Sequence, residues 1–211
     1  MDAASTHLCF AHVGKTSLTW VKGDAARPQQ REVATEGIMQ FFELVETRRS
    51  VRAYAKTAVE GEKIRRILAT ALLAPSAGDL QAYQIAVIEK SETKAALAAA
   101  ALGQDFVAEA PVILVFCANP QRSASRYGER GAMLYCTQDA TLAACYAQLA
   151  ATALGLASCW VGAFDETKVA DVLDLPARLR AVAIMPIGYA AEWPERPPRR
   201  PLEDLVRREA S

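Results

Sequence analysis

Apolar residues recur every three or four positions in several stretches of the chain, the spacing that buries one face of an α-helix. Local signals mark where these stretches begin and end: Ser91 and Asp165 are candidate N-caps, Pro75 follows the second stretch, and Gly155 ends the longest one. The pattern therefore predicts helices over residues 38–45, 60–74, 91–101, 132–154 and 165–173, and a last helical turn over residues 202–208.

Shorter apolar runs separate these helices, and their alternation and β-forming residues are typical of strands. They predict strands over residues 83–89, 112–117, 157–163 and 181–189. Because helices outweigh strands and the strands are scattered between them, the pattern predicts a layered α+β domain with helices around one sheet.

Residues 1–37 differ in character from the rest, with small and polar residues and no sustained period. We interpret them as a poorly ordered N-terminal extension that precedes a single domain over residues 38–211. The end of that domain, residues 190–211, is rich in proline and arginine and is interpreted as a C-terminal arm.

Composition excludes several classes of protein. The 211 residues include 24 basic and 24 acidic side chains, so no uniform basic field exists to attract nucleic acid or an acidic membrane. No stretch approaches the ~20 apolar residues of a membrane span. The five cysteines are odd in number and form no Cys-x-x-Cys pair, which favours reduced thiols in a cytoplasmic protein and no metal site.

Both histidines, His7 and His12, lie in the extension, so the domain itself lacks the usual catalytic side chain. A chain that does chemistry without histidine is expected to use a cofactor. Residues 48–52 read Arg-Arg-Ser-Val-Arg, and arginine forks with a serine hydroxyl match the oxygens of a phosphate. The alternative is solvated charge at the end of a helix, favoured by the helix dipole.

Two further segments could line a ligand. Residues 75–81 read Pro-Ser-Ala-Gly-Asp-Leu-Gln, where small residues allow close approach and Ser76 and Gln81 can form hydrogen bonds; the alternative is an ordinary turn. Residues 158–164 end in Gly162 and Ala163, whose backbone amides could meet a ring atom that gains negative charge. The alternative there is a buried strand that ends in a turn.

Two polar stretches remain. Residues 194–201 carry prolines and arginines, which suit either a second phosphate contact or a proline-rich ligand for a recognition domain. Residues 126–131 are interpreted as a polar loop, with Arg126 and Tyr127 as candidates for a lid over a substrate. The alternative is a solvated loop.

Four features occur in a characteristic order along the chain: the segment at 48–52, the segment at 75–81, the run from Gly155 to Phe164, and the closing turn at 188–192 with Arg-Arg-Pro-Leu-Glu at 199–203. In this combination the chain resembles the FMN-dependent nitroreductase family, over residues 39–206. The resemblance implies an α+β fold with a central, mostly antiparallel sheet, assembled as an intertwined homodimer. It also implies one FMN per subunit at each dimer interface.

The resemblance assigns roles residue by residue. It implies that the phosphate of FMN is held by the side chains of Arg48, Ser50 and Arg200, with Arg49 and Arg199 beside them. It implies that Arg52 lies near the pyrimidine edge and that Gly162 and Ala163 offer amides near the reactive ring nitrogen. The partner subunit would line the ring with Pro75, Ser76 and Ala77, in a segment that also holds Asp79 and Gln81. The sequence departs from the family in two places. Asp79 stands where the family often has asparagine. Ala82-Tyr83 replaces the frequent Pro-Trp, which implies a different pocket wall.

The activity that the resemblance implies is transfer of hydride from NADH or NADPH through the flavin to a small acceptor, a nitroaromatic or a quinone, by a ping-pong scheme. Two alternatives stay open. One is another reaction in the same family, reductive dehalogenation or breakdown of a flavin. The other is a non-enzymatic dimeric protein whose proline- and arginine-rich tail recruits a partner.

Overall fold

The computed structural model describes residues 35–209, with side chains from Phe41 onward. The proposed extension therefore lies almost wholly outside the described residues. The chain divides into two compact units, Met1–Phe42 and Glu43–Ser211. In the described part of the first unit, residues 35–42 belong to helix α1 (Thr35–Thr47), and the rings of Phe41 and Phe42 meet edge to face. The remaining description concerns the second unit.

One four-stranded antiparallel sheet lies at the centre of this unit, with strand order β1-β2-β4-β3. Its strands are β1 (Tyr83–Ile88), β2 (Val112–Ala118), β3 (Ala157–Ser158) and β4 (Arg180–Gly188). The predicted α+β fold is confirmed. The predicted strand over residues 157–163 is too long, because only two of its residues pair continuously with β4 and Val161 returns as an isolated bridge to Ile184.

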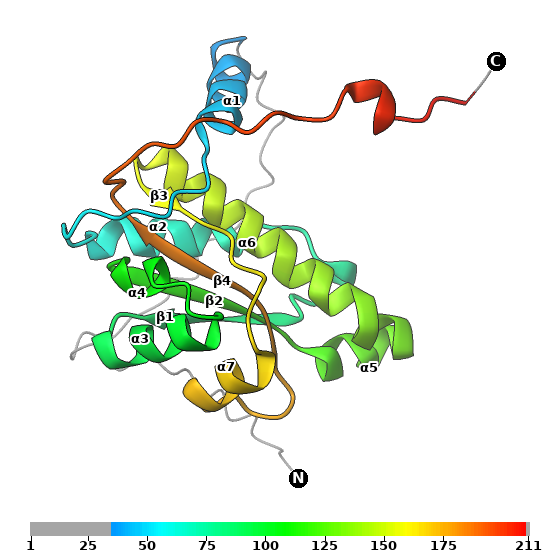
Figure 1. Ribbon diagram of the computed structural model, residues 1–211. Coiled ribbons are helices and arrows are strands. Elements are labelled where there is room, and N and C mark those ends of the chain that lie inside the picture. The colour runs from blue at the N-terminus through cyan, green and yellow to red at the C-terminus, as the bar shows by residue number, and fades with distance from the viewer. Residues whose placement is uncertain (1–34, 210–211) are drawn as a thin grey trace. The chain divides into compact units, whose positions relative to one another are not determined.

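Helices cover both faces of the sheet (Figure 1). Alternate residues of β2 point to opposite faces, as extended backbone requires, and all seven are buried. One face, including Leu114 and Phe116, packs against α2 (Gly61–Ala71) and α6 (Cys136–Ala153). The other, including Ile113 and Val115, packs against α3 (Ser91–Ala100), α4 (Phe106–Glu109) and α7 (Glu166–Val172). A strand buried on both faces explains the continuous apolar run in its sequence.

Helix α6 is the longest helix in the described part of the chain, and small side chains let it lie close to the sheet. Its buried positions are Cys136, Asp139, Ala140, Ala143, Ala144, Ala147, Gln148 and Ala151. The prediction of a long helix ending at Gly155 is confirmed. So is the N-cap at Asp165, whose carboxylate accepts a hydrogen bond from the Lys168 backbone N–H at 3.1 Å.

Two local predictions are wrong. Ser91 is the first residue of α3 and not its N-cap, which is Lys90 with no side-chain cap. Residues 126–131 are not a loop: residues Pro120–Arg130 form helix α5, followed by a π-helical turn over Gly131–Tyr135 that joins α6. Helix α5 begins there because the Asn119 side chain accepts from the Arg122 backbone N–H and Pro120 has a helix-compatible φ.

After β4 the chain continues as an exposed arm that runs away from the sheet (Figure 1). Its regular structure is one 3-10 turn, Leu202–Asp204, within the predicted last helical turn. Large apolar side chains on the arm are exposed: Trp193, Leu202, Leu205 and Val206. Within residues 35–209, no helix is both long enough and apolar enough to cross a membrane.

Candidate functional site

The 48–52 segment lies beside the start of the 158–164 segment, although the two are far apart in sequence. Ser50 forms a parallel bridge with Ser158, and the Val51 N–H donates to the Ser158 carbonyl at 3.1 Å. The hydroxyl of buried Tyr54 donates to the Val51 carbonyl at 2.9 Å and thereby holds the backbone between residues 51 and 54. Two segments that the sequence singled out separately are therefore brought together.

The three arginines of the 48–52 segment have different surroundings. The Arg49 guanidinium donates to the carbonyls of Glu46, Thr47 and Arg48, which supports the helix-end alternative for this residue. Arg52 is exposed, with its guanidinium carbon 5.8 Å from the centre of the Phe106 ring. Among the described residues, neither Arg48 nor Arg52 forms an ion pair with a carboxylate.

The titratable groups below these arginines stay neutral near pH 7. Burial raises the pKa of the Cys159 thiol, while the positive charges of Arg52 and, less strongly, Arg48 act in the opposite direction. Burial also raises the pKa of Tyr54 far above its ordinary value. Both arginines thus contribute positive potential near Cys159, and neither the neutral Cys159 thiol nor the neutral Tyr54 phenol cancels that potential.

Gly162 and Ala163 are exposed and offer backbone donors. Backbone donors before and after them are engaged, since the Val161 N–H donates to the Ile184 carbonyl and the Asp165 N–H donates to the Ala100 carbonyl. Within residues 41–209, the N–H groups of Gly162 and Ala163 have no acceptor. The buried Ser158 hydroxyl likewise has no partner within those residues. The 158–164 segment therefore presents an unsatisfied hydroxyl at its start, beside the 48–52 segment, and unsatisfied backbone donors near its end.

The 75–81 segment forms a tight turn of left-handed residues. Positive φ angles occur at Gly78 (57°), Asp79 (56°) and Gln81 (46°). The Ser76 hydroxyl oxygen accepts from the Gln81 N–H at 3.0 Å, and the Gln81 side chain donates to the Leu72 carbonyl at 3.1 Å. Ser76 and Gln81, which the sequence proposed as ligand contacts, thus also hold the turn itself.

Helix α5 lies against this turn and brings both lid candidates to it. The Arg126 guanidinium donates to the Gly78 carbonyl at 3.2 Å. A Cβ at Gly78 would meet the Tyr127 hydroxyl and the Arg126 guanidinium, so both side chains approach its backbone closely; the left-handed φ of 57° is what favours glycine here. The side chains predicted as a lid are therefore in contact with the predicted ligand segment.

Asp139 is the site residue that sequence reasoning missed. Its side chain is buried, and its two carboxylate oxygens accept from the backbone N–H groups of Ala77 at 2.9 Å and Ala82 at 3.2 Å. A signal was present in the sequence, because Asp139 is an acidic residue on the alanine-rich face of a helix that is otherwise apolar.

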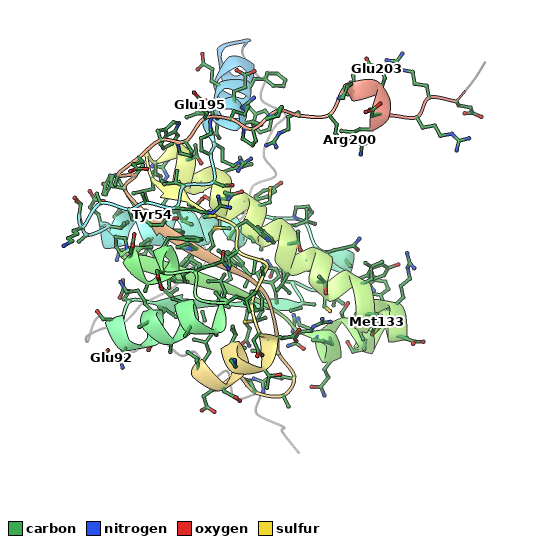
Figure 2. All side chains as sticks on the ribbon, viewed as in Figure 1. Tyr54, Glu92, Met133, Glu195, Arg200 and Glu203 are labelled. Atoms are coloured by element: carbon green, nitrogen blue, oxygen red, sulfur yellow. The ribbon has the colours of Figure 1, made fainter. Side chains whose placement is uncertain are left out.

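Arg196 of the arm donates to the carbonyls of Val45 and Glu46 at the end of α1, but Arg199 and Arg200 are not brought to Ser50 within one chain. Arg200 forms an exposed ion pair with Asp204, with 3.9 Å between Nε and Oδ2, and its guanidinium also donates to the Asp204 carbonyl. Figure 2 shows Arg200 well out on the arm, whereas Tyr54 lies in the body of the unit. Arg199, its neighbour, is exposed.

Two groups of predicted site residues thus result, one at 48–52 with 158–164 and one at 75–81 with α5. In the part of the chain that the structure describes, no hydrogen bond or ion pair joins the two groups. In the same part, no cluster of three His, Cys, Asp or Glu side chains could hold a metal ion.

Comparison with known proteins identifies the fold. The model of the family described as "Nitroreductase family" matches residues 45–104 and 94–189. The chain belongs to the nitroreductase family. A solved relative of this family, the NADPH:FMN oxidoreductase of Vibrio harveyi in complex with NAD+, superimposes with a TM-score of 0.74 at 27% identity. That match covers 81% of this chain and 77% of the Vibrio chain.

Curated relatives in the nitroreductase family carry several enzyme names. The "NADH dehydrogenase" of Thermus thermophilus is 33% identical over 186 residues, 75% of this chain and 91% of the relative. The "FMN reductase (NADPH)" of Bacillus subtilis is 28% identical over 76% of this chain and 70% of the relative. The "5,6-dimethylbenzimidazole synthase" of Rhodospirillum rubrum is 32% identical over 71% of this chain and 81% of the relative.

Proposed function

We propose that this nitroreductase-family chain is an FMN-dependent oxidoreductase that takes reducing equivalents from NADH or NADPH. The acceptor is a small molecule such as a nitroaromatic or a quinone, and donor and acceptor use one site in turn, in a ping-pong scheme. The observation that carries the proposal is the pairing of the 48–52 segment with Ser158. It brings Arg48 and Arg52, which form no ion pair among the described residues, to the start of the segment whose far end carries the unsatisfied amides of Gly162 and Ala163.

The residues present fit FMN, which carries a phosphate and a ring edge that gains negative charge on reduction. Arg48 and Ser50 would hold the phosphate, because Arg48 forms no ion pair among the described residues and Ser50 is exposed. Arg49 adds positive charge beside them. Arg199 and Arg200 complete the contact if the arm folds back in the assembled protein.

Bound FMN would supply two-electron chemistry, accepting hydride from the nicotinamide and returning it to the acceptor. The chain's own residues bind and orient. Arg52 stabilises negative charge at the pyrimidine edge, and the amides of Gly162 and Ala163 donate to the polar ring edge beside them. The neutral side chains of Cys159 and Tyr54 add no charge to the site. No histidine of the domain acts as acid or base, because both histidines lie in the extension.

We further propose that the protein functions as an intertwined homodimer in the cytoplasm. The separation of the two residue groups in one chain supports this, since Pro75, Ser76 and Ala77, with Asp79 and Gln81, would then line the flavin bound mainly by the partner subunit. Exposed apolar side chains on the arm support it too. Residues 1–37 would be an extension outside the domain at 38–211, and Arg126 and Tyr127 would border the substrate.

A second candidate is another reaction in the same site. The Rhodospirillum relative at 32% identity is named a synthase, not a reductase, which supports a reaction other than acceptor reduction. The candidates are breakdown of a flavin and reductive dehalogenation. Product analysis separates these reactions. Consumption of NAD(P)H with a quinone while FMN is recovered intact favours the reductase, whereas loss of FMN favours the alternative.

The visible absorption spectrum tests the central proposal. We expect purified protein to show flavin bands that bleach when NADH or NADPH is added without oxygen, and the donor that bleaches them faster is the preferred one. A colourless protein that also fails to bind added FMN would overturn the proposal and favour the non-enzymatic alternative, with the arm as a recruitment peptide.

Arg52→Ala is expected to slow reduction of the bound flavin about tenfold, because it removes the charge that stabilises the reduced ring. Rapid-mixing kinetics at full flavin occupancy would measure this step. Arg52→Lys is the matched control and should recover most of the rate, since it keeps the charge and loses the planar fork. Unchanged reduction kinetics in Arg52→Ala would remove this role from Arg52.

A further inference from the structure

The 75–81 segment has an unfavourable backbone that something must hold in place. Three of its seven residues have left-handed φ angles, and two of them, Asp79 and Gln81, are not glycine; the region is uncommon for any such residue, less so for aspartate than for glutamine. A strained turn persists only where surrounding contacts determine it, and such turns cluster at ligand sites. The contacts that hold this turn therefore bear on the ligand that it would touch.

Contacts reach the turn from two sides. On the outer side, exposed side chains of α5 donate to it, Arg122 to the Leu80 carbonyl and Arg126 to the Gly78 carbonyl. On the inner side, Asp139 of α6 accepts from both Ala77 and Ala82. Figure 1 shows the connection between α2 and β1 at the same end of the unit as α5 and the start of α6. Water competes for the exposed contacts, whereas it reaches the two bonds to buried Asp139 much less readily.

The burial of the Asp139 carboxylate costs free energy, because the group loses its contact with water. Only 2% of its surface is exposed, and it forms no ion pair within the described residues. A buried carboxylate without a cation is tolerated only when hydrogen bonds satisfy it. Its two N–H donors bracket the left-handed residues, so the bonds fix the turn at both of its ends. Charge-assisted bonds of this kind are about twice as strong as neutral ones.

We propose that Asp139 is a positioning residue: it fixes the 75–81 segment in the geometry that receives the flavin ring and ribityl chain. The inference rests on the proposed function, because that function supplies the ligand. Asp139 touches no ligand itself. It acts through the backbone of Ala77 and Ala82, and it holds the turn ready before the ligand arrives, which reduces the entropic cost of binding.

Two variants and one control test the inference in the full-length protein. Asp139→Ala removes both acceptors, whereas Asp139→Asn keeps the size, retains one acceptor and turns an amide N–H toward the second backbone donor. Ala144 lies on the same buried face of α6, and its methyl group cannot form a hydrogen bond to the turn, so Ala144→Gly only lowers helix stability. It separates general destabilisation from loss of this contact.

Amide hydrogen exchange in flavin-free protein measures how firmly Asp139 holds the 75–81 segment, without any activity measurement. We expect peptides covering residues 75–83 to exchange at least tenfold faster in both Asp139 variants than in Ala144→Gly, with the β2 and β4 strands unchanged. Equal exchange in the 75–83 peptides of Asp139→Asn and Ala144→Gly would overturn the inference. Asp139→Asn provides the answer if Asp139→Ala does not fold.

Ligand affinity completes the test. Affinities for FMN and for riboflavin should both fall about tenfold in the Asp139 variants, since the turn is assigned to the ring and ribityl chain that the two ligands share. Wild-type affinity in Asp139→Asn, despite faster exchange, would overturn the positioning role alone. Wild-type protein that binds neither flavin would overturn the proposed function and this inference together.

Discussion

Gly131→Ala is expected to destabilise the protein by about 1–3 kcal/mol, as overpacking of a rigid contact does. A Cβ at this position would lie 2.6 Å from the carbonyl oxygen and 2.8 Å from the carbonyl carbon of Ser123. These are backbone atoms of α5, brought back against the π-helical turn by a kink at Gly128, so no side-chain rotation relieves the overlap. Urea denaturation followed by circular dichroism would measure the loss.

The variant should also loosen α5 from the 75–81 turn, because α5 must move for the methyl group to fit. Gly61→Ala is the matched control: the nearest atom to its new Cβ is 3.9 Å away, in the Arg65 side chain, and the site is helical. We expect that control to change stability by no more than about 0.5 kcal/mol, or to stabilise slightly. An unchanged urea midpoint in Gly131→Ala would contradict the close packing of α5.

The sheet and its covering helices could be predicted because their signals are local and strong. In β2 every position is apolar, and the two faces of the strand pack against different helices, so the run of apolar residues is what its burial requires. Helix α6 combines a small-residue face with Gly155 at its end. Both the period and the stop signal agree with the tertiary structure.

Helix α5 was missed because its sequence is strongly polar and lacks an apolar stripe, which led to an interpretation as a loop. Its helical start is nevertheless encoded by Asn119 and Pro120. The strand over residues 157–163 was overestimated for the opposite reason. Its apolar composition persists beyond Ser158, although pairing with β4 stops there and resumes as one bridge at Val161.

At the candidate site, the sequence predicted the segments but not what holds them. Asp139 accepts from Ala77 across a separation of 62 residues, a contact that only the packing of α6 against the sheet creates. Similarly, the guanidinium of Arg49 donates hydrogen bonds to backbone carbonyls at the end of α1, so it is less available to a ligand. Motif reasoning names side chains that could bind a ligand, whereas tertiary contacts decide which of them remain free to do so.

Arg200→Ala is expected to weaken FMN binding about 10- to 100-fold and to leave riboflavin binding unchanged. Hydrogen bonds to charged groups contribute roughly 1.5–3 kcal/mol, and riboflavin lacks the phosphate that Arg200 would contact. The ion pair of Arg200 with Asp204 does not oppose this role, because both partners are more than half exposed, at 65% and 54%, and such pairs contribute little. Fluorescence titration of flavin-free protein with each ligand would measure the two affinities.

Arg207→Ala is the matched control, since it removes the same charge from an exposed position on the same arm. Equal losses in the two variants would mean that the arm contributes only general positive charge. A loss in Arg200→Ala that is the same for FMN and riboflavin would mean that the arm acts through assembly of the subunits and not through the phosphate. Selective loss for FMN in Arg200→Ala alone would require the arm to leave its exposed course and reach the 48–52 segment, which one chain by itself does not achieve.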